Sequence, residues 1–218
     1  FAYFKETLDN PKLDAEVKAQ TEAIIAKLKA AGHTVEAVAF PELEYLVPIY
    51  YILTTAEASS NLARFDGVHY GYRSEAVEDL EDVYKKSRTE GFGLEVKRRI
   101  LLGTFVLSSG YYDAYYGKAQ KARNLVRTKT NEIFADYDFI LSPTTPTTAF
   151  NIDMEVKDPT VMYLEDIFTV HANICGLPSI SLPLGSHSNK MPFGIQLTAP
   201  AFDDAGLLEV SKQFMAGL

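Results

Sequence analysis

The sequence predicts an α/β fold in which helices flank a mixed β-sheet. Three patterns predict this fold: a strand, helix and strand over residues 1–40, a long helical stretch over 50–136, and short apolar segments bounded by Pro and Gly over 137–218. The 218 residues are 47% hydrophobic and 23% charged, which is typical of a globular protein with a substantial core.

The beginning of the chain is predicted to form a βαβ unit. Residues 1–4 are apolar and predict a strand, and Asn10 followed by Pro11 is typical of a helix start. Gly32 predicts the end of that helix, and 34–40 predicts a second strand. Strands joined in this way are parallel, with a right-handed crossover. One face of the predicted helix is apolar, through Val17, Ile24, Ile25 and Leu28.

The middle of the chain is predicted to be a helical insertion between the second and third strands. Helices are predicted over 50–65 and 77–88, and two more over 94–135, with few strand signals between them. The segment 138–143 predicts the third strand.

The last part of the chain is predicted to complete the sheet. A helix is expected from about Val161 to Ile174, then strands over 179–184 and 193–199, and a terminal helix from Asp203. Both strands are short apolar runs, which suits strands that are buried on both faces.

Charge and composition argue against several classes of protein. A formal net charge of −8 and a pI near 5.0 disfavour a broad nucleic-acid surface, because phosphate binding depends on clustered Lys and Arg. No stretch approaches the roughly 20 apolar residues of a membrane helix. One basic run is favoured as a solvated helix face, with a phosphate-binding patch as the alternative. It comprises Lys118, Lys121, Arg123, Arg127 and Lys129.

Few residues are candidates for nucleophilic or metal chemistry. Cys175 lies four residues after His171 on a predicted helix, but a packed, inert cysteine is the favoured interpretation. Ser108 to Gly110 is predicted to lie inside a helix, which denies a serine the exposed turn of a nucleophile. The scattered histidines predict no metal site. A single cysteine fits a reducing compartment, so a cytoplasmic protein is expected.

Two features point either to a ligand or to internal structure. Arg98 and Arg99 lie among apolar residues of a predicted helix, so at least one should be partly buried and paired with a carboxylate or carbonyl. The segment 141–150 is rich in threonine and follows a predicted strand, where open α/β sheets bind ligands. On these patterns alone, an internal salt bridge is an equally good interpretation of the arginine. A plain connection between two elements is an equally good interpretation of segment 141–150.

Several long motifs resemble the amidase signature family, and within it the glutamine-hydrolysing A subunits of tRNA-dependent amidotransferases. They are AEASSNLARFDGVHYGYRS, SRTEGFGLEVKRRILLGTFVLSSGYYDAYYGKAQKAR, DFILSPTTPTTAF and NICGLPSISLPLG, in this order. The resemblance runs from about Tyr50 to Phe214. It implies a large α/β fold around a mixed sheet, of which residues 1–218 would be the C-terminal part.

The resemblance also implies a reaction and partners. Such enzymes hydrolyse glutamine through a Ser-Ser-Lys triad in a Gly/Ser-rich segment, and no such segment occurs here. The chain alone is therefore expected to be inactive and to need no cofactor of its own. The released ammonia would reach a B subunit that uses ATP and Mg²⁺ to activate glutamate on Glu-tRNA(Gln), while a C subunit braces the two.

The same resemblance assigns the residues that grip glutamine. Arg99 would bind the α-carboxylate, Asp166 the α-ammonium, and Tyr50 would form a hydroxyl-bearing wall. Thr144, Thr145 and Thr147 would border the same pocket or serve the fold alone. Two alternatives remain: an amidase acting on other amides, which would have no use for Arg99 and Asp166, and a non-catalytic domain that docks partner subunits.

Overall fold

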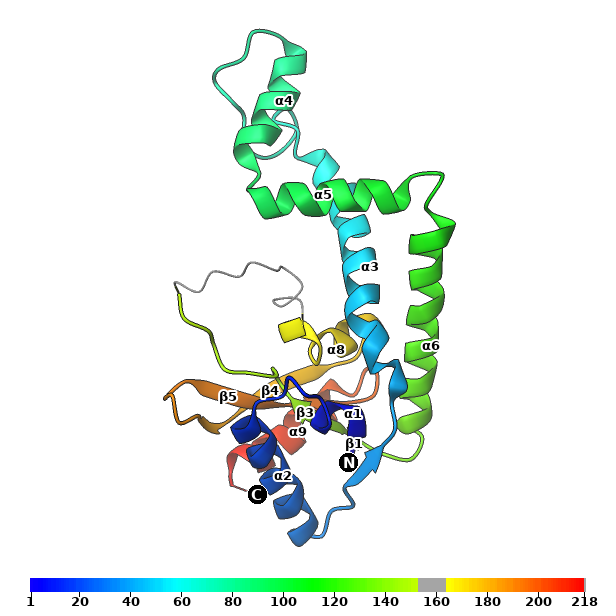
Figure 1. Ribbon diagram of the computed structural model, residues 1–218, viewed down its shortest axis with the longest axis vertical. Coiled ribbons are helices and arrows are strands. Elements are labelled where there is room, and N and C mark those ends of the chain that lie inside the picture. The colour runs from blue at the N-terminus through cyan, green and yellow to red at the C-terminus, as the bar shows by residue number, and fades with distance from the viewer. Residues whose placement is uncertain (153–163, 218) are drawn as a thin grey trace. The chain divides into compact units, whose positions relative to one another are not determined.

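The structure is a computed structural model that describes residues 1–152 and 164–217 (Figure 1). The chain folds as two compact units. The sheet unit comprises Phe1–Val47 and Arg123–Leu218, and the helical unit comprises Pro48–Ala122. The helical unit is thus inserted between strands of the sheet unit.

The sheet unit contains a five-stranded mixed sheet with the strand order β2-β1-β3-β5-β4. β1 (Ala2–Phe4) pairs in parallel with β2 (Glu36–Val38) and with β3 (Ile140–Pro143). β5 (Pro192–Thr198) is antiparallel to both β3 and β4 (Ser179–Ser186). The predicted mixed α/β sheet and its parallel strand–helix–strand unit are confirmed.

The helix of this unit begins later than the sequence predicted. A short helix, α1 (Lys5–Leu8), follows β1 directly, and α2 (Ala15–Ala30) begins after Asp14, whose carboxylate accepts hydrogen bonds from the first turn. Asn10 instead closes a turn, because its side chain accepts the N–H of Lys12 at 2.9 Å. The prediction that the helix begins near Asn10 and Pro11 was therefore wrong.

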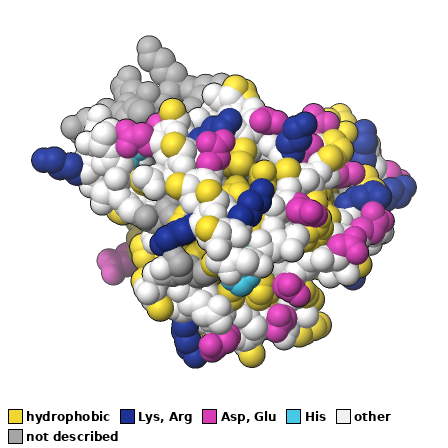
Figure 2. All heavy atoms as spheres, turned by 90° about the horizontal axis from the view of Figure 1, so that it is seen from below, with side chains coloured by type: hydrophobic (Ala, Val, Ile, Leu, Met, Phe, Trp, Pro, Cys, Tyr) yellow, Lys and Arg dark blue, Asp and Glu magenta, His cyan; other side chains and the backbone are white. Residues whose placement is uncertain are grey.

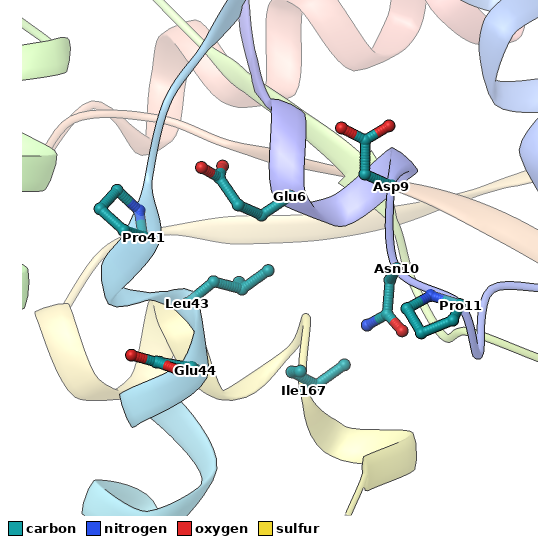
Figure 3. Close-up of a pocket in the computed structure, with 8 residues that line it drawn as sticks. All are labelled: Glu6, Asp9, Asn10, Pro11, Pro41, Leu43, Glu44 and Ile167. Atoms are coloured by element: carbon teal, nitrogen blue, oxygen red, sulfur yellow. The ribbon is translucent and has the colours of Figure 1, made fainter.

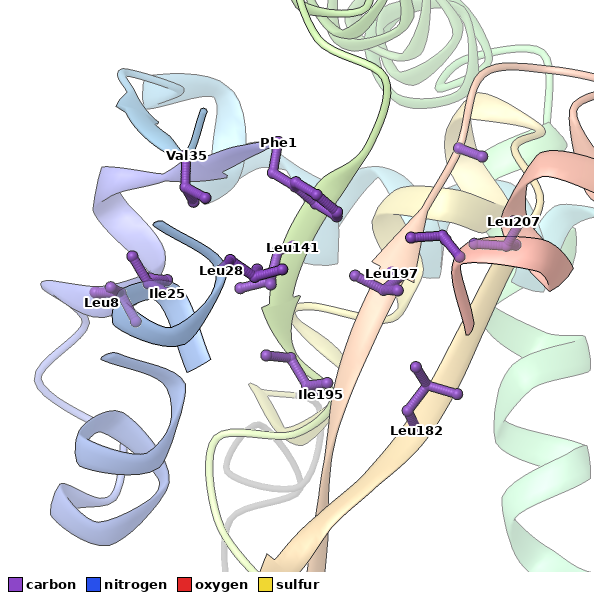
Figure 4. Close-up of a cluster of buried hydrophobic side chains, with 12 residues drawn as sticks. Phe1, Leu8, Ile25, Leu28, Val35, Leu141, Leu182, Ile195, Leu197 and Leu207 are labelled. Carbon is purple, nitrogen blue, oxygen red and sulfur yellow. The ribbon is translucent and has the colours of Figure 1, made fainter. Parts of the chain in front are cut away.

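The two faces of the sheet carry different helices (Figure 1). α2 and the terminal helix α9 (Asp204–Met215) cover one face, and α8 (Val170–Cys175) covers the other. Leu141 and Leu197 lie directly opposite each other on neighbouring strands, point to the α2 and α9 side and are fully buried. Figure 4 shows the cluster they belong to. It comprises Phe1, Leu8, Ile25, Leu28, Val35, Leu141, Leu182, Ile195, Leu197, Ala199, Leu207 and Val210.

The middle of the chain is helical, as predicted. The elements are η1 (Pro41–Tyr45), α3 (Leu46–Asn61), η2 (Leu62–Arg64), α4 (Leu80–Gly91), α5 (Leu94–Leu107), η3 (Asp113–Gly117) and α6 (Lys118–Ile133).

Two predicted helices are interrupted. α5 ends at Leu107, and the Ser108 hydroxyl donates to Phe105 O at 2.7 Å, so the Ser108 to Gly110 segment is a turn rather than helix interior. The helix predicted from Val161 lies partly outside the described residues. Its described part consists of η4 (Leu164–Asp166) and α8, with a turn between them.

Within the helical unit, α3 and α5 cross closely at a glycine. A Cβ placed on Gly103 would lie 2.0 Å from the Thr55 carbonyl oxygen and 2.6 Å from the Ser59 Cβ. The Ser59 and Thr104 hydroxyls lie 2.9 Å apart beside this point. The absence of a side chain at Gly103 is what allows the two backbones to approach.

The surface carries charges of both signs. On the face shown in Figure 2, Lys and Arg side chains are interspersed with Asp and Glu rather than gathered in one patch. Among the described residues, no helix is long and apolar enough to cross a membrane.

Candidate functional site

Arg99 lies in α5 and is held by groups of its own unit. Its side chain is 35% exposed, and its Nε donates to Glu95 Oε1 at 3.1 Å, one helical turn earlier. The guanidinium also lies 5.4 Å from the centre of the Tyr51 ring. Burial opposes the charge, but Glu95 and Tyr51 together raise the pKa of Arg99. The predicted partly buried, carboxylate-paired arginine is confirmed.

Arg98 differs from Arg99, which the sequence pattern did not predict. Its side chain is 61% exposed and its Nη1 lies 3.7 Å from Glu95. The apolar neighbours in the sequence do not bury Arg98, because Leu101 and Leu102 are themselves exposed. Arg99 is therefore the arginine with a fixed orientation.

Tyr50 lies beside Tyr51 in α3. The two rings meet edge to face, with centroids 5.3 Å apart. Tyr51 thus contacts both predicted site residues of the helical unit, Tyr50 and Arg99. Sequence reasoning missed Tyr51, since nothing but its position next to Tyr50 distinguishes it from other helical aromatics.

The remaining predicted residues lie in the sheet unit, around a segment that we call the threonine loop, residues 144–148. The Thr144 hydroxyl lies 2.7 Å from the Ser181 hydroxyl, and the Thr144 N–H donates to Gly194 O at 3.1 Å. The Thr145 hydroxyl donates to Thr147 O at 2.7 Å. These bonds follow directly after β3 and give the loop a defined shape.

The threonine loop reaches the short helix η4, which contains Asp166. The Thr147 hydroxyl donates to Glu165 Oε2 at 2.9 Å. Asp166 is half-buried, and its carbonyl accepts the Thr169 hydroxyl at 3.1 Å. The structure therefore brings the threonine loop next to the segment of Asp166, while Tyr50 and Arg99 belong to the helical unit.

His171 and Cys175 lie on one face of α8, as predicted, and both are buried. His171 Nε2 lies 2.8 Å and Cys175 Sγ lies 3.7 Å from the Thr130 hydroxyl. That hydroxyl donates to Val126 O at 2.9 Å, so His171 Nε2 carries the proton. Burial raises the pKa of Cys175 to about 11, which is opposite to a reactive thiolate. The interpretation of a packed cysteine is confirmed.

Acid is expected to destabilise the protein through His171. Burial lowers the His171 pKa from 6.5 to about 4, so the unfolded chain binds this proton more readily than the folded chain. The neutral ring contributes about 3 kcal/mol to the free energy of unfolding above pH 6.5. This contribution is lost as the pH falls from 6.5 towards 4. Urea unfolding between pH 7.5 and 4 measures it, and His171→Gln should flatten the profile. An equally steep profile in that variant would contradict the assignment.

A separate cavity lies beside α1 in the sheet unit (Figure 3). Its volume is about 470 Å³, and none of the predicted site residues lines it. Glu6, Asp9 and Glu44 give it an acidic wall, and the Glu6 carboxylate accepts the Phe40 N–H at 2.8 Å. Its chemistry suits cations rather than a carboxylate.

The basic run on α6 is mainly a solvated face. Arg123 is the exception, because its Nε donates to Ile174 O at 2.8 Å at the end of α8. Lys129 pairs with Glu132 at 2.7 Å. Among the described residues, no three His, Cys, Asp or Glu side chains are arranged to hold a metal ion.

Known proteins that are similar to this chain show its family. The sequence profile of the family described as Amidase matches residues 1–208. The chain belongs to the amidase family. Solved amidases share its fold at low identity: one structure described as an amidase has a TM-score of 0.76 at 21% identity, covering all of this chain and 45% of that one.

The chain is more closely similar to one group within the amidase family. It is 53% identical over 202 residues to the A subunit of a glutamyl-tRNA(Gln) amidotransferase from Brevibacillus brevis, and 53% identical over 199 residues to the corresponding protein of Koribacter versatilis. These matches cover 93% and 91% of this chain but only 41% and 42% of the relatives.

The chain is also similar to a crystal structure from this group. The A subunit of the Thermotoga maritima glutamyl-tRNA(Gln) amidotransferase is 39% identical with a TM-score of 0.71, over 97% of this chain and 40% of that one. The chain therefore spans about 41% of the length of the curated relatives it matches.

Proposed function

We propose that this chain is the glutamine-binding, C-terminal portion of the A subunit of a glutamyl-tRNA(Gln) amidotransferase. The observation that supports this most is 53% identity over 93% of the chain to proteins of that name. The complete protein would hydrolyse glutamine and release ammonia in the cytoplasm. The Ser-Ser-Lys triad would come from a part of it beyond these residues.

The proposed glutamine contacts use complementary charges. Arg99 would bind the α-carboxylate, because a guanidinium presents two parallel donors to a carboxylate. Asp166 would bind the α-ammonium, Tyr50 would form a wall of the site, and Thr144, Thr145 and Thr147 would border it. The fixed orientation of Arg99 over Tyr51 supports its role, since an oriented guanidinium loses less entropy on binding.

The ammonia would be used elsewhere in the assembly. A B subunit that binds ATP and Mg²⁺ would convert Glu-tRNA(Gln) to Gln-tRNA(Gln), and a C subunit would hold the two together. This chain would need no cofactor of its own. An amidase acting on apolar amides is the alternative, but it would gain nothing from Arg99 and Asp166.

Ammonia release measures the proposed activity. The full-length protein, assembled with its B and C subunits, should release ammonia from glutamine, and the 218-residue chain alone should release none. An apolar aryl amide serves as the competing substrate. Turnover of the aryl amide by the full-length protein without turnover of glutamine would contradict the proposal in favour of the alternative.

A further inference from the structure

The tip of the β4–β5 hairpin, residues 187–191, is a rigid turn. The His187 N–H donates to Met191 O at 2.9 Å, and the Lys190 N–H donates to His187 O at 2.7 Å. The Asn189 side-chain oxygen accepts the Met191 N–H at 2.9 Å, and Lys190 adopts a left-handed φ of 67°. The Asn189 side chain therefore projects from a defined backbone.

This hairpin tip is anchored to the start of α2. His187 Nε2 lies 3.2 Å from Asp14 Oδ1 and 3.3 Å from Glu16 Oε1. The Asn189 N–H donates to His187 Nδ1 at 3.2 Å, so Nδ1 is the acceptor and Nε2 is the ring nitrogen that faces the two carboxylates. The Ser188 N–H and hydroxyl both donate to Glu16. The imidazole is a bridge between the hairpin and the helix.

The anchored tip holds the threonine loop at one end, and α2 holds it in the middle. Asn189 Nδ2 donates to the Thr148 hydroxyl at 2.9 Å. The Asp14 N–H donates to Pro146 O at 2.9 Å. Asp14 thus contacts the threonine loop through its backbone and the hairpin tip through its carboxylate. These contacts join the threonine loop, the hairpin tip and the start of α2 in one network.

The far side of the loop leads towards the proposed ammonium-binding residue. Thr147 is adjacent to Thr148 and donates to Glu165 at 2.9 Å, and Glu165 is adjacent to Asp166. A displacement of Thr148 would therefore be transmitted through one hydrogen bond to the segment that carries Asp166. None of these contacts involves a group that would touch the reacting amide.

We propose that Asn189 is a positioning residue for glutamine: by binding the Thr148 hydroxyl it fixes the threonine loop, and through Thr147 and Glu165 it fixes the orientation of Asp166. The inference rests on the proposed function, because it assigns the network to the glutamine site. Asn189 does not itself touch the substrate. Its effect should fall on the affinity for glutamine and not on the chemical step.

The test uses matched variants in the full-length assembled protein. Thr148→Val removes the hydroxyl with little change of shape, and Thr148→Ser keeps it. Asn189→Ser keeps a side-chain oxygen that can close the turn, but it removes the amide donor and is too short to reach Thr148. Agreement between Thr148→Val and Asn189→Ser, which change the two ends of one contact, excludes an effect of either residue on its own. Asn131→Ser on the exposed face of α6 is the control for the same exchange at a site without this contact.

The expected result is a rise of the glutamine KM by about threefold in Thr148→Val and Asn189→Ser, the size of one neutral hydrogen bond, with kcat little changed. Thr148→Ser and Asn131→Ser should match the parent. Because the two groups form one contact, the double variant should be no worse than either single variant. Hydrogen exchange of the threonine loop should accelerate in the same variants.

Two results would overturn the inference while the proposed function stands. Unchanged hydrogen exchange in the loop would show that the contact does not fix it. Faster exchange with an unchanged KM would show that the contact is merely structural. Faster exchange with a parallel fall of kcat and thermal stability, and no rise of KM, would show the same. A parent protein that does not hydrolyse glutamine would refute the proposed function itself, and with it the assignment of this network to glutamine.

Discussion

Replacing Arg99 by alanine in the full-length protein is expected to raise the KM for glutamine by about 100-fold, the loss typical of removing one partner of a hydrogen-bonded charge pair. The reacting amide lies at the other end of glutamine from its α-carboxylate. The kcat at saturating glutamine should therefore fall much less than kcat/KM. Steady-state ammonia release over a range of glutamine concentrations measures both.

Arg98 offers a matched control one residue away. It lies on the same helix and near the same Glu95, but its side chain is 61% exposed and makes no close contact with an aromatic ring among the described residues. Arg98→Ala should change the KM by less than about twofold, as expected for an exposed pair. Equal effects of the two substitutions, or an unchanged KM in Arg99→Ala, would contradict the proposed carboxylate contact.

Replacing Gly103 by alanine is expected to destabilise the helical unit by about 3 kcal/mol, the upper range for an overpacked core. Alanine has the higher helix propensity, worth about 1 kcal/mol. The steric clash outweighs this gain, because the new Cβ would lie 2.0 Å from the backbone carbonyl oxygen of Thr55. That oxygen cannot move without shifting α3. Urea or thermal unfolding of the full-length protein measures the loss.

Gly110 is the control for this substitution. Nothing lies within 4 Å of a Cβ placed there, and its backbone does not adopt a left-handed φ. Gly110→Ala should therefore leave stability unchanged or raise it slightly, by about 0.5 kcal/mol, through the entropy of the unfolded chain. A Gly103→Ala variant as stable as Gly110→Ala would mean that the two helices do not cross as closely as described.

The fold was largely predictable because its strongest signals are local. The apolar face of α2 recurs at helical spacing, and Gly32 follows it with a φ of 92°. The true helix start was missed because Asn10 and Asp14 are both good capping residues, and only the tertiary structure shows that Asn10 closes a turn. The break between η4 and α8 also depends on packing, since His171 and Cys175 sit in the core against Thr130.

The candidate site was less predictable because it depends on contacts across the chain. A carboxylate partner for an arginine was expected, and Glu95 lies four residues before Arg99, a helical spacing that favours such a pair. Arg98 and Arg99 could not be separated by periodicity, and Tyr51 has no sequence signal of its own. The bonds from Thr147 to Glu165 and from Asn189 to Thr148 join residues 18 and 41 positions apart, which no local pattern indicates.

The helical unit is inserted between β2 and β3, so the residues that build the sheet and the residues around Arg99 occupy separate stretches of the sequence. For the sheet, Pro48–Ala122 is part of one long connection between β2 and β3, the two strands that flank β1. The entropy of closing such a loop changes by only about 0.6 kcal/mol when its length doubles. Insertions, deletions and substitutions around Arg99 can therefore accumulate at little cost to the sheet. Under the proposed function, Tyr50 and Arg99 could therefore change within the insertion, while Asp166 and the threonines would remain on the sheet unit.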